Sequence, residues 1–230
     1  MTMIADNLQA VHARVAAACV AASRPVSSVT LLAVSKTFSI QAIEEAIAAG
    51  QRCLGENYIQ EAVEKIRVLG HATAQWHCIG PVQSNKTRLV AEHFDWVQSV
   101  DRLKIAQRLS EQRPAHMAPL QICIQVNTDG GANKAGIAPA ELVALAHAVA
   151  QLPRLKLRGL MTIPEPASDF AAATAVHLHA RQLLNRLNAE GMALDTLSMG
   201  MSADLEAAIH AGSTMVRVGT AIFGGRPRPV

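Results

Sequence analysis

The chain has 230 residues, half of them hydrophobic and 17% charged, and its 21 basic and 18 acidic side chains give a formal net charge of +3. This composition excludes a disordered chain and provides enough apolar residues for a sizeable core. The basic excess is small and is not gathered in a cluster with aromatic side chains. Nucleic acid is therefore not expected as the main partner, whereas a small anion remains compatible with the charge.

The cysteines and the N-terminal segment indicate the cellular compartment. Cys19, Cys53, Cys78 and Cys123 lie far apart and none forms a C-x-x-C pair, so their spacing suggests neither a zinc site nor a disulfide framework. Residues 1–15 lack the pattern of a signal peptide, and no apolar run is long enough to span a bilayer. We therefore expect a cytoplasmic protein with reduced thiols.

After a first amphipathic helix, the sequence alternates between short apolar strands and helices. Ile4, Leu8, Val11 and Val15 have helical spacing, which predicts a helix over residues 4–22. The predicted strands are apolar runs bounded by turn residues, and they cover residues 30–36, 53–55, 76–80, 96–100, 120–127, 155–163, 194–198 and 214–219. The helices predicted between them cover residues 40–49, 59–69, 86–93, 102–112, 139–151, 168–190 and 202–211.

This alternation predicts an α/β protein, a single (β/α)8 TIM barrel that spans residues 1–230 as one domain and carries an extra N-terminal helix. A doubly wound open sheet is the alternative. The first strand-to-helix turn has no G-x-G-x-x-G sequence, which removes the main reason to favour a Rossmann dinucleotide site. Three residues are predicted to cap helices at their N-termini: Ser39, Asp101 and Ser202.

Lys36 stands where the first predicted strand ends. The preceding run of residues 31–34 is apolar, as in a strand that is covered on both faces. An amine at the edge of an apolar core loses hydration, which disfavours its ammonium form and leaves a free base that can add to an aldehyde. Lys36 is therefore a candidate for a Schiff base. The alternative is a solvated turn residue.

Several residues at the C-terminal ends of the predicted strands are polar or glycine, and barrel active sites lie at those ends. They are Lys36, Asn57, Gln83, Ser84, Asn85, Asn127, Ser198, Gly219 and Thr220. The last two loops are the most specific of these segments. A helix capped by Ser202 offers unpaired N–H groups to an anion, Gly219 permits close approach of the backbone, and Thr220 adds a hydroxyl. The two loops predict a phosphate cradle. The alternative is that these residues are an ordinary helix cap and ordinary turn glycines.

Arg217 is the charged residue of the last predicted strand. Period-two alternation puts it on the face opposite Val216 and Val218. If that face is the barrel interior, the guanidinium lies below the ligand. If it is the outer face, Arg217 pairs with a helix carboxylate, and the sequence leaves both readings open.

A Schiff-base lysine, a phosphate cradle and an interior arginine together indicate pyridoxal 5′-phosphate (PLP) as the cofactor. At these positions the chain closely resembles the pyridoxal phosphate homeostasis protein family, also called the YggS or proline-synthase co-transcribed (PROSC) family. The resemblance extends from about residue 5 to residue 225. The segments that carry it are 33–37 (AVSKT), 55–58 (GENY), 77–86 (HCIGPVQSNK), 158–161 (RGLM), 198–202 (SMGMS) and 217–224 (RVGTAIFG).

The resemblance implies a barrel like the N-terminal domain of bacterial alanine racemase. It also implies a protein that binds PLP and takes part in its intracellular homeostasis as a carrier or regulator, without robust turnover, with apo forms of PLP-dependent enzymes as candidate partners. The residues that the resemblance places around the cofactor are Lys36, Asn57, Ser198, Ser202, Arg217, Gly219 and Thr220.

Each of these residues receives a role from the resemblance. Lys36 carries the cofactor as an internal aldimine, and Asn57 lies near the ring. Ser198 or Ser202 holds the phosphate together with Gly219 and Thr220. Arg217 faces the pyridine nitrogen, where a cation opposes protonation of the ring and makes it a poorer electron sink. No metal is expected.

The sequence departs from the family pattern in two places, after the first predicted strand and at residues 226–230, which read RPRPV where some relatives end in lysines. Relatives often have a second lysine and a proline after the cofactor lysine, whereas this chain has Phe38 and Ser39, which puts any role of a second amine in doubt. Lys134 matches a lysine of the family's loop after strand five and is either a cofactor contact or a solvated cation. Tyr58, the only tyrosine, is a candidate second base for a racemase, although packing is the simpler role.

Two other functions stay open at this point. The first is an enzyme, either a weak amino-acid racemase or a barrel aldolase that uses Lys36 on a sugar phosphate. The second is an interaction protein whose barrel is vestigial.

Overall fold

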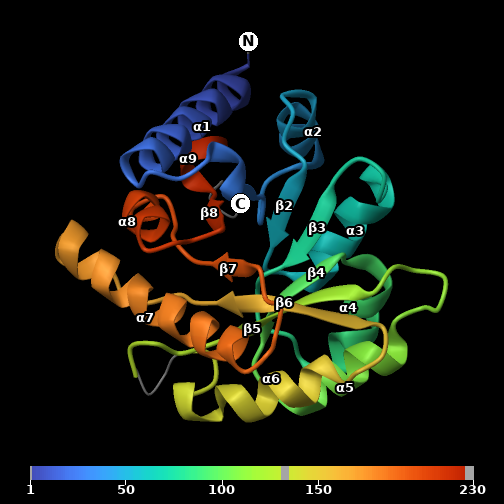
Figure 1. Ribbon diagram of the computed structural model, residues 1–230. Coiled ribbons are helices and arrows are strands. Elements are labelled where there is room, and N and C mark those ends of the chain that lie inside the picture. The colour runs from blue at the N-terminus through green and yellow to red at the C-terminus, as the bar shows by residue number, and fades with distance from the viewer. Residues whose placement is uncertain (1, 131–134, 226–230) are drawn as a thin grey trace.

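The computed structural model describes residues 2–130 and 135–225, which form a closed barrel of parallel strands in sequence order (Figure 1). The strands are β1 Thr30–Val34, β2 Cys53–Glu56, β3 Gln75–Cys78, β4 Trp96–Val100, β5 Leu120–Gln125, β6 Leu155–Met161, β7 Thr196–Ser198 and β8 Met215–Val218. β8 closes the barrel by pairing with β1, with Leu32 opposite Arg217. The predicted TIM barrel is confirmed, and the open sheet is excluded.

Helices connect the strands on the outside of the barrel, as the alternating pattern predicts. The α-helices are α1 Met3–Ala21, α2 Ile40–Ala48, α3 Ile59–Leu69, α4 Thr87–His93, α5 Leu103–Gln112, α6 Leu142–Ala150, α7 Phe170–Ala189, α8 Leu205–His210 and α9 Thr220–Phe223. Short 3₁₀ turns occur at Val26–Ser28, Ser84–Lys86 and Pro139–Glu141. Within the described part of the chain, no helix is both long and apolar enough to cross a membrane.

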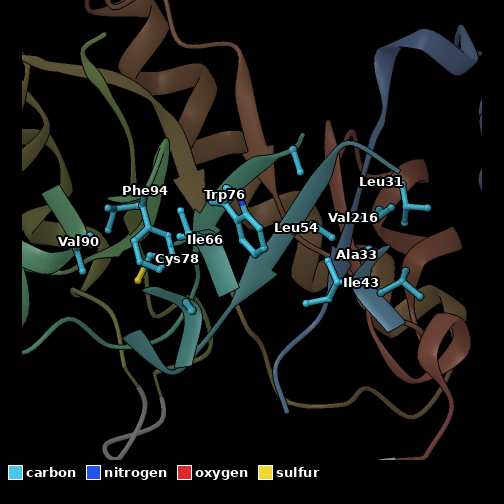
Figure 2. Close-up of a cluster of buried hydrophobic side chains, with 14 of the residues drawn as sticks. Leu31, Ala33, Ile43, Leu54, Ile66, Trp76, Cys78, Val90, Phe94 and Val216 are labelled. Atoms are coloured by element: carbon cyan, nitrogen blue, oxygen red, sulfur yellow. The ribbon is translucent and has the colours of Figure 1, made fainter. Parts of the chain in front are cut away.

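The main hydrophobic core lies between the strands and the helices. Leu31, Ala33 and Val216 point from β1 and β8 toward this outer layer, where Ile43 of α2 packs against them (Figure 2). Because successive side chains of a strand alternate between faces, the residues between these positions point into the barrel. Leu32 accordingly belongs to a separate interior cluster with Ile79, which directly follows β3, and Met215 of β8.

The extra helix α1 covers the part of the barrel where the chain closes. It contacts α2, α8 and α9, and its apolar residues, among them Leu8, Val11 and Val15, are buried there (Figure 1). Since α9 has only 4 residues, it leaves the neighbourhood of β8 and β1 largely uncovered. The burial of α1 therefore supplies the apolar cover that a longer final helix gives in a regular barrel.

Two of the predicted helix caps are wrong. Asp101 does not cap α5, because its Oδ1 accepts a hydrogen bond from the Arg102 guanidinium at 2.8 Å and Arg102 occupies the N-cap position. Ser202 does not cap α8, which begins at Leu205 after the N-cap residue Asp204. Ser39 caps α2 as predicted, with its side chain accepting from the N–H of Ala42.

Candidate functional site

A cavity of about 320 Å³ opens at the C-terminal ends of the strands, where β1, β2 and β8 meet the loop after β7. This volume is in the range of pockets that hold small molecules. Its walls combine apolar side chains with a few polar groups, as expected of a cofactor site. The residues that line it are Val34, Lys36, Phe38, Asn57, Ile79, Ile163, Met201, Ser202, Ala203, Arg217, Gly219 and Thr220.

Lys36 reaches the cavity from the turn that follows β1. Its side chain is partly buried, and the next residue, Thr37, has a φ of 67°, which is unusual for a β-branched residue. Beyond the turn, Phe38 lines the cavity and stacks on Phe223, with ring centroids 4.9 Å apart and 26° between the ring planes. Position 38 is therefore part of an apolar wall of the cavity.

The side of the cavity formed by the loops after β7 and β8 is rich in hydrogen-bond donors. Among the described residues, none accepts a hydrogen bond from the backbone N–H of Ser202, Ala203 or Thr220. The same holds for the side-chain hydroxyls of Ser202 and Thr220. Polar groups without partners at a cavity wall are available to a ligand, and this donor set suits an anion.

The loop after β7 is held in shape by Asp204. Gly200 has a φ of 92°, a conformation that only glycine adopts easily, and it turns the chain back over the barrel. Asp204 Oδ1 then accepts from the N–H of Met201 at 2.7 Å, and Oδ2 accepts from His177 Nε2 at 2.9 Å. Burial acts to raise the pKa of Asp204, but these hydrogen bonds hold it below its usual value, so the carboxylate stays ionised.

Arg217 points into the barrel, which decides between the two readings of the sequence. Val216 and Val218 belong to the outer core, whereas the guanidinium of Arg217 lines the cavity and the residue is 4% exposed. Its Nη1 donates to Ser198 Oγ and its Nη2 to the Thr162 carbonyl, both at 2.8 Å. Burial lowers the pKa of Arg217 to about 10, so the side chain remains a cation at neutral pH.

Below Arg217, a chain of hydrogen bonds runs through the interior of the barrel. Ser198 Oγ accepts from Arg217 and donates to Gln98 Oε1 at 2.6 Å, and Gln98 Nε2 lies 2.9 Å from His77 Nδ1. Since the amide nitrogen can only donate, Nδ1 of His77 accepts, and its Nε2 carries the proton toward Gln75 Oε1 at 3.1 Å. Gln98 Nε2 also donates to Met215 Sδ at 3.1 Å. Through Ser198, the position of Arg217 therefore depends on Gln98 of β4, on the opposite side of the barrel.

His77 makes the stability of this interior depend on pH. Complete burial lowers its pKa to about 3, whereas the unfolded chain has the ordinary value of 6.5. The unfolded state therefore binds the extra proton below pH 6.5, and stability falls as the pH is lowered. We expect the unfolding free energy to drop by roughly 2 kcal/mol more in the wild type than in His77→Gln between pH 7 and pH 5. Urea titrations at both pH values measure this difference, and equal losses would contradict it.

Asn57 contributes a second unpaired group to the cavity. Its Oδ1 is buried and accepts no hydrogen bond from any described residue. The backbone of Asn57 lies directly against Gly80. A Cβ added at Gly80 would lie 2.3 Å from the Asn57 carbonyl oxygen. Glycine at position 80 is therefore what allows Asn57 to approach the cavity closely.

Comparison with known families supplies the identity of this barrel. The family described as "Alanine racemase, N-terminal domain" matches residues 6–227. The chain is 59% identical over 226 residues to the pyridoxal phosphate homeostasis protein of Pseudomonas aeruginosa, with 98% of this chain and 97% of that protein covered. The corresponding protein of Escherichia coli K12 is 54% identical over 229 residues, with 98% of each chain covered. The chain belongs to the pyridoxal phosphate homeostasis protein family.

Solved structures agree with this assignment. PipY of Synechococcus elongatus PCC7942, determined with PLP bound, is 39% identical and superposes with a TM-score of 0.83, covering 96% of this chain and 100% of PipY. D-threonine aldolase of Filomicrobium marinum has a TM-score of 0.78 at 18% identity, covering 99% of this chain and 63% of that one, which shows a shared fold only. The resemblance to this homeostasis family and the alanine racemase-like barrel, both expected from the sequence, are confirmed.

The structure brings together most of the site residues that the sequence predicts for a pyridoxal phosphate homeostasis protein. Ser198 is the exception, since it is fully buried below Arg217 and is not among the residues that line the cavity. Tyr58 is 52% exposed and lines no part of this cavity, so the expected packing role is not what the structure shows. Lys134 lies outside the described residues. The predicted site residues that do line the cavity are Lys36, Asn57, Ser202, Arg217, Gly219 and Thr220.

The apolar walls of the cavity could not be predicted from the sequence. Met201 and Ala203 lie inside or next to the recognised SMGMS segment, and Ile163 follows β6, yet apolar residues at loop positions carry no signal of their own. The buried ionic residues behind Lys36 were also missed. Glu56 ends an otherwise apolar strand, and this was the one local signal that could have identified them.

Proposed function

We propose that this chain binds PLP in the cavity at the end of β1 and acts as a carrier or regulator of the cofactor. The observation that supports the proposal most strongly is the placement of two chemically different groups in one cavity. The amine of Lys36 reaches it from β1, and the donor-rich loops after β7 and β8 line it as well. An amine suits the aldehyde of PLP, and the N–H groups suit its phosphate.

The residues present fit the cofactor in three further respects. The buried Asn57 Oδ1 lacks a donor and is available to a polar substituent of the ring. At Gly219, an added Cβ would lie 3.2 Å from the Val34 carbonyl oxygen, so glycine permits the close approach of the backbone after β8 to the end of β1 at the cavity. The bound PLP in PipY shows that a relative with this fold accepts the cofactor. We assign Lys36, Asn57, Ser202, Arg217, Gly219 and Thr220 to contact with PLP, and Ser198 to the support of Arg217.

Lys36 forms the covalent bond in this proposal. Its neutral amine adds to the aldehyde carbon, a water molecule leaves with the carbonyl oxygen, and a C=N bond joins the side chain to the cofactor. When bound, PLP supplies an electron-accepting ring and a reactive imine carbon. The apolar side chains of Val34, Phe38 and Ile79 exclude water from this part of the cavity, which protects the imine from hydrolysis.

The charges of the cavity argue against robust turnover. Among the described residues that line the cavity, Lys36 and Arg217 are the two with ionisable side chains, and both are basic. We place Arg217 beside the pyridine nitrogen, where a cation opposes protonation of the ring and weakens it as an electron acceptor. Tyr58, the candidate second base, is not among the residues that line this cavity. A storage or delivery role fits this chemistry better than racemisation.

The remaining parts of the proposal concern the chain as a whole. We propose that it acts as one PLP-binding domain and that apo PLP-dependent enzymes receive the cofactor. The cytoplasmic location expected from the sequence stays a prediction.

Borohydride trapping tests the proposed function. The protein is incubated with PLP, reduced with borohydride, and analysed by intact mass and peptide mapping. We expect one reduced PLP adduct per chain, located on Lys36, together with the visible absorption of a Schiff base before reduction. Absence of the adduct, or its location on another lysine, would overturn the proposal.

A further inference from the structure

A group of ionic residues lies behind the turn that carries Lys36, on α3 and at the end of β2, and two of them, Glu56 and Lys65, are buried. Lys65 of α3 is 4% exposed, and its Nζ donates to the Ser35 carbonyl at 2.9 Å and to Glu56 Oε1 at 2.8 Å. Ser35 Oγ donates to the same carboxylate oxygen at 2.7 Å. The residue that precedes Lys36 is thus held through both its main chain and its side chain.

The residue that follows Lys36 is held by the same group. Glu61 Oε1 accepts from the N–H of Thr37 at 2.7 Å and from Lys65 Nζ at 2.5 Å. Thr37 has a φ of 67°, in the left-handed region that β-branched residues avoid. Its hydrogen bond to Glu61 stabilises this conformation, which sets the direction in which Lys36 leaves the backbone. We call these contacts the Lys65 clamp, formed by Ser35, Thr37, Glu56, Glu61 and Lys65.

The Lys65 clamp is not the arrangement that stability alone would favour. A buried ion pair loses hydration, and apolar residues of similar size often give equal or greater stability. Glu56 is fully buried, and its Oε2 has no hydrogen-bond partner among the described residues. Burial raises the pKa of Glu56, although the contacts with Lys65 and Ser35 act to lower it. What the ionic residues supply is directional contact on both sides of Lys36.

We propose that Lys65 is a positioning residue that, with Glu56 and Glu61, fixes the backbone around Lys36 so that its amine meets the aldehyde of PLP. The inference rests on the proposed function. It assigns no contact between Lys65 and the cofactor, because Lys65 is not among the residues that line the cavity. Its effect is confined to the covalent step, since the donor-rich loops after β7 and β8 are separate from the Lys65 clamp.

Lys65→Met tests this inference, with two ligands measured in parallel. PLP reports the covalent step through the rate of the borohydride-trapped adduct. Pyridoxine 5′-phosphate, which has an alcohol in place of the aldehyde, reports non-covalent binding of the ring and phosphate. We expect adduct formation to slow about ten- to hundredfold, as displacement of a reacting group by about 1 Å does. The affinity for pyridoxine 5′-phosphate stays within about threefold of wild type.

Two further variants control the experiment. Arg67→Met removes an exposed cation from the same helix and should leave both readouts unchanged. If Lys65→Met does not fold, Lys65→Met/Glu56→Gln also removes the carboxylate that would be left unpaired, and the same split between the two ligands is expected. Adduct formation at the wild-type rate, or an equal loss of both ligands, would overturn the inference. A wild-type protein without an adduct on Lys36 would instead overturn the proposed function.

Discussion

Lys36→Ala is expected to abolish the borohydride-stable adduct with PLP, because no other lysine lines the described cavity. The non-covalent part of binding should survive, since Ser202, Gly219 and Thr220 are untouched by the substitution. We expect the affinity for pyridoxine 5′-phosphate to change by less than about threefold. Intact mass after reduction measures the loss of the adduct. The affinity for pyridoxine 5′-phosphate is measured by binding, with its competition against PLP in the wild-type protein as the reference.

Lys104→Ala is the matched control, because Lys104 is exposed on α5, away from the cavity. It should retain the full adduct. An adduct of normal yield in Lys36→Ala would show that another amine captures the aldehyde. Loss of pyridoxine 5′-phosphate binding in the same variant would show that Lys36 also shapes the phosphate end.

Gly80→Ala is expected to lower both stability and cofactor binding. The added Cβ would stand 2.3 Å from the carbonyl oxygen, 2.8 Å from Cα and 2.9 Å from the carbonyl carbon of Asn57. These are backbone atoms that cannot rotate away, so the end of β2 must shift. We expect a loss of about 3 kcal/mol in the unfolding free energy, at the upper end of the usual cost of overpacking. Urea denaturation measures the loss.

The same shift moves Asn57 at the cavity wall, so binding of pyridoxine 5′-phosphate should weaken about tenfold in Gly80→Ala. Gly225→Ala is the control, because an added Cβ there meets no atom within 4 Å and the φ of this glycine is not positive. A Gly80→Ala protein with wild-type stability would mean that the backbone at Asn57 yields more easily than the contact distances imply.

The order of strands and helices could be predicted from the sequence because each element leaves a local signal. An apolar run bounded by turn residues predicts β1, and Ser39 is predictable as the cap of α2 because a capping side chain acts within the first turn of its own helix. Asp101 and Ser202 have the same local signal and do not cap. The Asp101 carboxylate accepts from Arg102 instead of from the first turn of α5. In the loop after β7, Asp204 accepts from the N–H of Met201 and takes the N-cap position of α8 in place of Ser202.

In the candidate site, too, some features could be predicted from the sequence and others were decided by the fold. The sequence alone determined that a lysine ends the first strand and that Gly219 and Thr220 end the last, since these follow from positions along a strand. Closure of the barrel decided that Arg217 points inward, because alternation puts it opposite Val216 without saying which face is inside. Closure likewise placed Ser198 below Arg217 rather than at the cavity wall.

The contacts behind Lys36 show why tertiary structure was needed. Lys65 lies 30 residues from Ser35 in the chain, and Ser198 lies 100 residues from Gln98. No periodicity of a helix or strand links positions so far apart, whereas packing of α3 against the barrel and closure of the barrel bring them within hydrogen-bond distance. The sequence determined which groups this protein has for capturing an aldehyde and an anion. The folded barrel decided which of them face the cavity and which hold the others in place.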